Sequence, residues 1–577
     1  MLGVYHMKKL RYVSIFCSVL LLVPVGSFLP ICSSQSLPSS GPSQEFIDGR
    51  RLLWDAPAIP PPPEGFPVLI LLHARFQHAE NWFPTPNGST DQAAFTTKAL
   101  KNGFLIIAPD AETITPDPYG IRDWSYTQHT TNDSIDLLFI QHILTWLETT
   151  PPVSVDLSQL FCLGFSSGGI MTSRIGHFFG DRFAAIAVCS GANADAVTTL
   201  GYLQYPIFNI SAPQSFEPDF PPTLISLGNL DHRVPPAAGT HFSEELMRAG
   251  IRTTLLVNPF GVHRWQSVFD NETLHWFLYG YRKPAQPTQP IAGPGGSNYS
   301  HGKVRQTKYG SGAHEFWIFE PSDPTPASAP LIVFNHGWSA FFPGPYKAWI
   351  EHLVRRGNIV VYPRYQLGLT IGLRFATQNA ISAVKQAITI LQEGDHVRPD
   401  LEKFGIVGHS LGGGITAEMA ALANTSGLPT PKAVMPVQPF LRPYTMMTNF
   451  SGIPSTALLL VVVGENDTIA GNQSGKLIFL TSSKVPFTQK DYVIQRSDNY
   501  GFPALVADHF TPVCFPNSTL VDAMDYYSTW KLFDALTDYA FYGINRDYCL
   551  GNTSQQRFMG LWSDGVPVKE LVVTDTP

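Results

Sequence analysis

Two serines of this 577-residue chain lie in a motif that can make a serine nucleophilic. Ser410 is the central residue of GHSLG (408–412), and Ser166 is the central residue of GFSSG (164–168), so both satisfy G-x-S-x-G. In this pattern the serine occupies a sharp turn between a strand and a helix, and the flanking positions must be glycine because the turn is tight and the strand and helix crowd each other. Each motif follows an apolar run and precedes a helix-like segment, as the mechanism requires. We therefore predict Ser410 and Ser166 as nucleophiles; the alternative is a glycine-rich structural turn.

A nucleophilic serine needs an imidazole to accept its proton and a carboxylate to orient that imidazole. On an open parallel sheet these groups follow the serine in the order Asp, His, each in a loop after a later strand. Asp467 directly follows the apolar run in VVVGENDTIAG, and His509, in LVADHFTP, is the first histidine after it. The second half therefore predicts the set Ser410, Asp467 and His509.

The first half offers the same order of residues. Asp231 follows an apolar run in GNLDHRVPP, and His263 follows the next run in GVHRW. His232 competes for the role of base, but it adjoins Asp231 on the same turn and is expected to be an exposed loop histidine. The predicted set is Ser166, Asp231 and His263.

Short apolar runs alternate with helix-like segments on both sides of a proline- and glycine-rich stretch. Continuous apolar strands separated by helices are typical of a parallel sheet covered on both faces. The predicted strands of the first half are 68–74, 104–110, 160–166, 183–191, 223–229 and 253–259. Those of the second half are 331–337, 359–365, 404–410, 432–439, 457–467 and 491–497. The fold class is therefore α/β, with one architecture used twice.

The chain is too long for one ordinary core, and its 44% hydrophobic content is that of a folded protein. Proline-rich stretches precede the first half and separate it from the second. We predict a signal peptide (1–33), a Pro-rich N-terminal segment (34–66), a first domain (67–282), a Pro/Gly-rich linker (283–303) and a second domain (304–577).

The N-terminus has the pattern of a secretory signal. Lys8, Lys9 and Arg11 precede a short apolar run, 13–25, and a small polar segment follows. A transmembrane anchor fits less well because the run is short, and a lipoprotein anchor at Cys32 fits less well because the preceding residue is not small. We expect an extracellular protein with no stable membrane span in the mature chain.

Charge and cysteine content limit the partners. The net charge of −7, with no basic cluster beyond the N-terminus, predicts no nucleic-acid partner. A Cys514–Cys549 disulfide would close a loop of about 35 residues and contribute about 3–4 kcal/mol. Cys162 and Cys189 lie in apolar runs, as two buried thiols or as a second bridge. No cysteine has metal-ligand spacing, and we expect no metal and no organic cofactor.

The motifs resemble those of known families. The first half resembles secreted feruloyl esterases and polyhydroxybutyrate depolymerase-like esterases through GFSSGG, GNLDHRVPP and GVHRW. The second half is similar to dienelactone hydrolases, platelet-activating-factor acetylhydrolases and cutinase-like polyester hydrolases through NHGW, GHSLGGG, GENDTIAG and ADHFTP. The resemblance implies two α/β-hydrolase domains, each a mostly parallel sheet with helices on both faces and each with the triad named above.

Backbone N–H groups should hold the oxyanion, one from the residue after each serine and one from the loop after the first inner strand. In the second half these donors are Leu411 and Trp338, and the Trp338 ring either faces substrate or packs in the wall. In the first half they are Ser167 and Arg75.

The first oxyanion loop departs from the family's usual His-Gly-x-Gly. Ala74 and Phe76 stand where glycines are expected, and a Cβ disfavours positive φ. Because one misplaced donor costs about 10²–10³ in rate, we expect the first site to be slow, specialised or inactive.

Ser410 and Asp467 are only 57 positions apart, too few for a helical cap. An open site of this kind admits bulky or polymeric esters. We therefore predict a secreted serine carboxylic-ester hydrolase acting on a small or polymeric ester. The alternatives are a serine peptidase of the same fold, one active domain with the other binding substrate, and a non-catalytic binding protein on the same scaffold.

Overall fold

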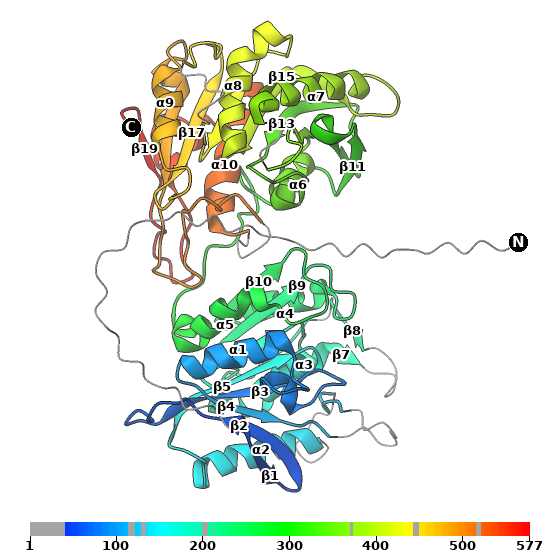
Figure 1. Ribbon diagram of the computed structural model, residues 1–577, viewed down its shortest axis with the longest axis vertical. Helices are drawn as coiled ribbons and strands as arrows, with labels where there is room; N and C mark the ends of the chain where they lie inside the picture. Colours follow the sequence, from blue (N-terminus) through cyan, green and yellow to red (C-terminus); the bar gives the residue numbers. More distant parts are fainter. Residues whose placement is uncertain are drawn as a thin grey trace, which may run out of the picture. The chain divides into compact units, whose positions relative to one another are not determined.

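The computed structural model describes residues 41–112, 122–127, 134–198, 206–211, 213–369, 373–441, 449–514 and 521–577. They contain two large sheets, one in the first region (residues 43–282) and one in the second region (residues 303–577). Figure 1 shows the first in blue to green and the second in green to red, each with helices on both faces. The predicted α/β fold class is confirmed.

The first sheet has an antiparallel edge and a parallel body. β1 and β2 run antiparallel to their neighbours, and the strands from β4 to β10 are parallel. The order within the described residues is β1 (Ser43–Ile47), β2 (Arg50–Asp55), β4 (Leu105–Pro109), β3 (Phe66–Leu72), β5 (Val155–Phe165), β6 (Ala185–Cys189), β9 (Thr223–Gly228), β10 (Thr253–Asn258). A separate pair, β7 (Val197–Thr198) and β8 (Ile207–Phe208), lies outside it.

The second sheet repeats this order and adds one antiparallel strand at the far edge. Its order is β11 (Lys303–Tyr309), β12 (Phe316–Ser322), β14 (Ile359–Pro363), β13 (Ser328–Asn335), β15 (Arg398–His409), β16 (Ala433–Val437), β17 (Leu458–Gly464), β18 (Lys490–Gln495), β19 (Val572–Thr574). Even the register shift recurs, at Pro67/Val68 in β3 and at Pro330/Leu331 in β13.

Helices cover both faces because the inner strands are apolar on both sides. One face of the first sheet packs on α2, α3 and α4, and the other packs on α1 and α5. One face of the second sheet packs on α7, α8 and α9, and the other packs on α6 and α10. The bounds are α1 (Thr90–Lys101), α2 (Ile135–Thr149), α3 (Ser167–Phe179), α4 (Pro236–Arg248), α5 (Asp270–Leu278), α6 (Lys347–Arg355), α7 (Ala376–Leu391), α8 (Leu411–Ser426), α9 (Gln473–Thr481), α10 (Trp530–Tyr542), α11 (Ser554–Arg557).

One segment differs from the sequence prediction. Residues 43–55, assigned to the Pro-rich N-terminal segment, form β1 and β2 of the first sheet, because β2 pairs with β4. The linker is held against the second region, where the Gly295 N–H donates to Asp534 Oδ2 at 2.7 Å. The other domain bounds stay predictions, and the predicted signal peptide, with Cys32, lies outside the described residues. No helix within the described ranges has the length and apolar character needed to cross a bilayer.

Candidate active sites

Both predicted nucleophiles occupy the same strained turn between a strand and a helix. Ser166 lies between β5 and α3 with φ 58° and ψ −119°, and Ser410 lies between β15 and α8 with φ 56° and ψ −121°. A non-glycine residue at positive φ costs about 1–3 kcal/mol and persists only where its surroundings impose it. The neighbouring glycines permit the turn: a Cβ at Gly412 would lie 2.2 Å from the Asn335 carbonyl oxygen, and one at Gly168 would lie 2.4 Å from that of Leu72.

The second region brings its three predicted residues into a continuous hydrogen-bonded row. His509 Nε2 lies 2.9 Å from Ser410 Oγ, and His509 Nδ1 lies 2.8 Å from Asp467 Oδ2. Because the carboxylate can only accept, Nδ1 carries the proton and Nε2 is free to accept from the serine hydroxyl. All three side chains are buried.

Asp467 is held in its charged form. Burial alone would raise the pKa of this carboxyl, but hydrogen bonds from His509 and from the Ala470 and Ile469 N–H groups outweigh it and lower the pKa below its ordinary value. The two backbone N–H groups reach Oδ1 at 2.8 and 2.9 Å. Oδ2 is therefore left to orient the imidazole.

The first region forms the same row with slightly more exposure to solvent. His263 Nε2 lies 2.8 Å from Ser166 Oγ, and His263 Nδ1 lies 2.7 Å from Asp231 Oδ2. The Arg233 and Val234 N–H groups donate to Asp231 Oδ1 at 2.8 and 2.9 Å. The Asp231 side chain is buried, the His263 side chain is 16% exposed, and His232 is exposed, as predicted.

The oxyanion loops follow β3 and β13 and share one conformation at their fourth residue. Phe76 has φ 66° and Ser339 has φ 70°, so a side chain occupies the left-handed region in both. The departure at Phe76 therefore does not distinguish the first loop from the second. In each loop the first histidine fixes the next peptide: His73 Nδ1 lies 2.7 Å from the Ala74 carbonyl oxygen, and His336 Nδ1 lies 2.6 Å from that of Gly337.

In each region the predicted backbone donors come from the start of a helix and from the oxyanion loop. Leu411 and Ser167 are the first residues of α8 and α3, where N–H groups have no partner within the helix. Trp338 and Arg75 occupy the third position of their loops. The Trp338 ring is not buried in a wall: it is 52% exposed, and its Nε1 donates to the Leu369 carbonyl oxygen at 2.6 Å.

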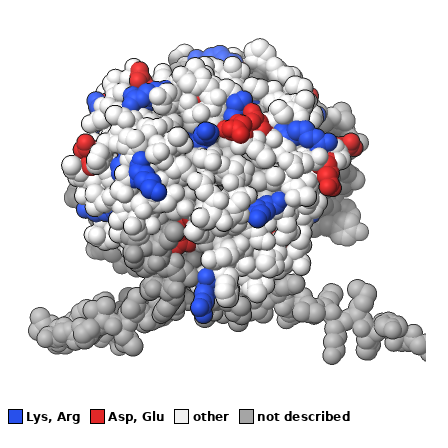
Figure 2. All heavy atoms as spheres, turned by 90° about the horizontal axis from the view of Figure 1, so that it is seen from above, with Lys and Arg blue, Asp and Glu red and all other residues white. Residues whose placement is uncertain are grey.

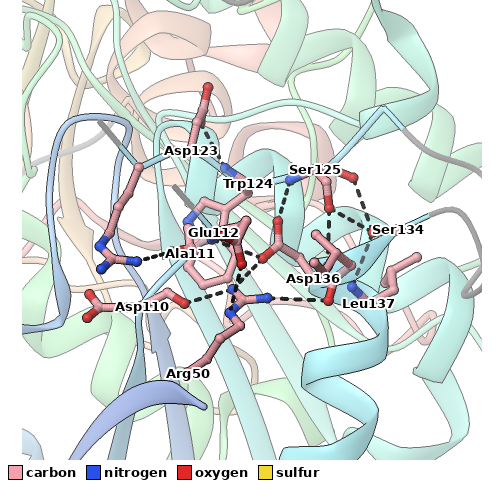
Figure 3. Close-up of polar contacts among 12 residues, drawn as sticks. Arg50, Asp110, Ala111, Glu112, Asp123, Trp124, Ser125, Ser134, Asp136 and Leu137 are labelled. Carbon is pink, nitrogen blue, oxygen red and sulfur yellow. Dashed lines mark hydrogen bonds and ion pairs between the residues drawn. The ribbon is translucent and has the colours of Figure 1, made fainter. Parts of the chain in front are cut away.

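A polar cluster around Arg50 and Asp136 lies in the first region (Figure 3). Arg50 donates to the Asp110 carbonyl oxygen at 2.8 Å and pairs with Asp136, which also accepts from the Ser125 N–H at 2.7 Å. This cluster anchors the segment from which Trp124 Nε1 donates to the His73 carbonyl oxygen at 2.7 Å.

Asp123, beside Trp124, pairs with the predicted donor residue Arg75, with 3.2 Å between Oδ2 and Nε. Burial raises the pKa of Asp123 to about 6, although the Arg75 charge opposes the shift.

The surroundings of the two serines differ. Ser166 opens into a cavity of about 290 Å³ whose lining includes Arg75, Tyr126, Arg233 and Pro206. In the second region, the segments that follow β13, β14, β16 and β17 and the segment that carries His509 have exposed apolar side chains, named here the apolar rim: Trp338, Leu367, Leu369, Phe440, Ile469, Val506 and Phe510. Between Ser410 and Asp467, the described residues (410–441 and 449–467) form α8, β16 and β17 and no further helix.

The predicted Cys514–Cys549 disulfide is wrong. Both cysteines are free and buried. The Cys514 thiol donates to the Pro345 carbonyl oxygen at 3.3 Å, and the Cys549 thiol donates to the Arg546 carbonyl oxygen at 3.3 Å. Sequence spacing gives the loop entropy but not the Cβ separation that a disulfide requires. Cys162 and Cys189 are also free and buried, and burial raises the pKa of each thiol to about 12.

Sequence reasoning missed a set of buried polar residues around the second triad. Tyr346, His409 and Gln438 contact the backbone of the oxyanion loop and of the loop that carries His509. The one available signal was His409, a buried-type strand residue inside the motif itself.

Comparisons with known proteins agree with the fold. The family described as alpha/beta hydrolase fold matches residues 333–472, a span that includes Ser410 and Asp467. A poly(3-hydroxyoctanoate) depolymerase of Pseudomonas fluorescens is 25% identical over 234 residues, which cover 40% of this chain and 80% of the depolymerase. Feruloyl esterase B of Thermothelomyces thermophilus is 30% identical over 128 residues, 22% of this chain and 39% of the esterase. These similarities support a hydrolase of the α/β-hydrolase fold.

Proposed function

We propose that the chain is a secreted serine ester hydrolase with two active sites, one at Ser410 and one at Ser166. The observation that carries the proposal is the repeated row of serine, imidazole and carboxylate, with neighbouring atoms 2.7–2.9 Å apart in both regions. The names of the two relatives, a polyester depolymerase and a feruloyl esterase, favour ester over amide substrates.

The proposed reaction is acyl transfer through the serine. Ser410 Oγ attacks the ester carbonyl carbon while His509 Nε2 accepts the hydroxyl proton, and Asp467 stabilises the imidazolium. The backbone N–H groups of Leu411 and Trp338 stabilise the oxyanion of the tetrahedral intermediate. The imidazolium then returns the proton to the leaving alcohol, and water, deprotonated by the same histidine, hydrolyses the acyl-enzyme. Ser166, His263 and Asp231 take the same roles, with Ser167 and Arg75 as backbone donors.

The two sites are proposed to accept different esters. The apolar rim around Ser410 favours bulky, apolar or polymeric esters, because exposed apolar surface gains free energy when substrate covers it. The Ser166 cavity, with two arginines in its lining, favours smaller and more polar esters. In the face drawn in Figure 2, charged side chains are scattered among uncharged ones without a large patch of one sign. That distribution is compatible with a neutral substrate.

A fluorophosphonate probe and p-nitrophenyl esters of increasing chain length test the proposal on wild type, Ser166→Ala, Ser410→Ala and the double variant. Each single variant should keep one labelled serine, and the double variant should keep none. Turnover of long-chain esters should fall most in Ser410→Ala. Wild-type protein that neither labels nor hydrolyses any ester would contradict the proposal.

A further inference from the structure

A chain of buried hydrogen bonds joins the second oxyanion loop to the loop that carries the base. The Gly337 N–H donates to Tyr346 Oη at 2.8 Å, and Tyr346 Oη lies 2.8 Å from His409 Nδ1. On the other side of the ring, His409 Nε2 lies 2.8 Å from the His509 carbonyl oxygen and 3.1 Å from Gln438 Oε1. We call this series the Tyr346–His409 bridge.

The direction of each hydrogen bond follows from the chemistry of the groups. His409 Nε2 faces two oxygens that can only accept, so it carries the proton and donates. Gln438 is oriented consistently, because its Nε2 donates to the Asp508 carbonyl oxygen. Full burial lowers the pKa of His409 to about 3, so the ring is neutral and its Nδ1 accepts from the Tyr346 hydroxyl. Tyr346 Oη in turn accepts from the Gly337 N–H. The donated hydrogen bonds therefore all run the same way, from Gly337 through Tyr346 and His409 to the His509 carbonyl oxygen.

The first region has no counterpart of this bridge among its described residues. The position of His409 is taken by Phe165, whose ring stacks on His263 at 5.5 Å between centroids. The Ala74 N–H, equivalent to that of Gly337, donates instead to Gln77 Oε1 at 3.1 Å, within its own loop. Gln266 donates to the Val262 and Arg264 carbonyl oxygens at 2.8 and 2.9 Å and so braces the His263 loop locally.

The bridge also explains the glycine at position 337. A Cβ there would lie 2.7 Å from Tyr346 Oη and 3.2 Å from His409 Nδ1. The first loop, which lacks both partners, carries Ala74 at the same place. The glycine and the bridge therefore occur together in the second region and are both absent from the described part of the first.

We propose that Tyr346 and His409 are positioning residues of the Ser410 site that fix the base and the oxyanion loop relative to one another. His409 fixes the backbone of His509, and Tyr346 fixes the peptide that precedes the predicted donor Trp338. Neither side chain reacts with substrate. The inference rests on the proposed function of Ser410 and adds to it a coupling between two catalytic elements.

The test uses the full chain with Ser166→Ala, so that all turnover comes from Ser410. Tyr346→Phe removes one hydroxyl without changing shape, and His409→Phe introduces the residue that the chain itself uses at position 165. Each should lower kcat about tenfold with KM within about twofold, because a small displacement of a catalytic group is costly while substrate contacts remain. The double variant should be no slower than the slower single variant, since both changes break one chain.

Two further variants separate positioning from general stability. Tyr309→Phe removes another tyrosine–histidine hydrogen bond of the same region, 3.1 Å from Tyr309 Oη to His396 Nε2, and should leave kcat unchanged. His409→Gln retains an N–H donor for the His509 carbonyl oxygen and should recover part of the rate lost in His409→Phe.

A Tyr346→Phe variant that turns over at the parent rate, or single effects that multiply in the double variant, would overturn the inference and leave the proposed function intact. A parent protein whose Ser410 is not labelled and which hydrolyses no ester would contradict both the inference and the proposed function of Ser410.

Discussion

The two regions build the same row of catalytic atoms but hold it in different ways. In the first, Gln77 braces the oxyanion loop and Gln266 braces the base loop, each from within its own loop, while Trp124 and Asp123 hold the oxyanion loop from a third segment. In the second, the two loops are braced to one another through Tyr346 and His409. The strand order and the angles of the serine turn are almost unchanged between them. The fold therefore fixes where the three side chains meet, while the residues behind them determine how rigidly the loops are coupled.

The two regions also differ in the residues that they expose near the predicted sites. Ser166 faces a cavity with two arginines in its lining, whereas the loops of the second region carry the exposed side chains of the apolar rim. This difference is the basis for the proposal that the two sites accept different esters.

The largest expected effect tests whether the two rows are equivalent. Asp467→Asn, in a Ser166→Ala background, should lower kcat at Ser410 by about 10⁴, because an amide favours the wrong imidazole tautomer. Asp231→Asn, in a Ser410→Ala background, should do the same at Ser166. Steady-state kinetics with p-nitrophenyl esters measure both values. A loss below tenfold in only one of them would break the equivalence.

The next effect separates the two oxyanion loops. Gly337→Ala should lower kcat at Ser410 about 10- to 100-fold, because the new Cβ would lie 2.7 Å from Tyr346 Oη and displace the loop. The matched change Ala74→Gly should leave turnover at Ser166 within about threefold. Gly337→Ala is measured in the Ser166→Ala background and Ala74→Gly in the Ser410→Ala background, with the same p-nitrophenyl ester kinetics. Equal effects at both positions would show that the loops are supported alike.

Acid should destabilise the second region through one histidine that the first does not have. Burial lowers the pKa of His409 to about 3, below the ordinary 6.5, so unfolding takes up a proton between these values. Its contribution to stability is complete above pH 6.5 and decreases as the pH falls. Between pH 7 and pH 5 this amounts to about 2 kcal/mol. In urea unfolding, the decrease in the free energy of unfolding from pH 7 to pH 5 should therefore be about 2 kcal/mol smaller in His409→Phe than in wild type.

His73 and His336 make the corresponding contribution in both regions, because burial lowers the pKa of each to about 4. They provide the shared background against which the His409 effect is measured. An identical pH dependence in wild type and His409→Phe would contradict the prediction.

The smallest effect concerns strain that the regions share. Phe76→Gly should be about 1 kcal/mol more stable than Phe76→Ala, since both lose the ring and only glycine avoids the Cβ penalty at positive φ. Ser339→Gly should likewise be about 1 kcal/mol more stable than Ser339→Ala. Thermal unfolding measures both differences. A gain in one loop only would show that the strain is not shared.

Much of this protein could be read from local patterns. A serine between glycines after an apolar run specifies a strand–turn–helix, and the steric needs of that turn fix residue types within a few positions. The acid and base follow later strands in a fixed order, so Asp467, His509, Asp231 and His263 were predictable, and the structure brings each histidine beside its serine and each aspartate beside its histidine. The alternation of apolar runs and helical segments likewise gave the two sheets.

Other features depended on contacts between segments that are distant in sequence. The pairing of β2 with β4 brings residues 50–55 into the first sheet, and the burial of Cys514 and Cys549 against separate carbonyl groups leaves no disulfide. The Tyr346–His409 bridge joins residues that are distant in sequence, from Gly337 to His509, and neither its partners nor its direction follows from any local pattern. Local sterics determine which residues a turn accepts, but a side-chain hydrogen bond depends on Cβ positions and directions that exist only once the sheet has been assembled.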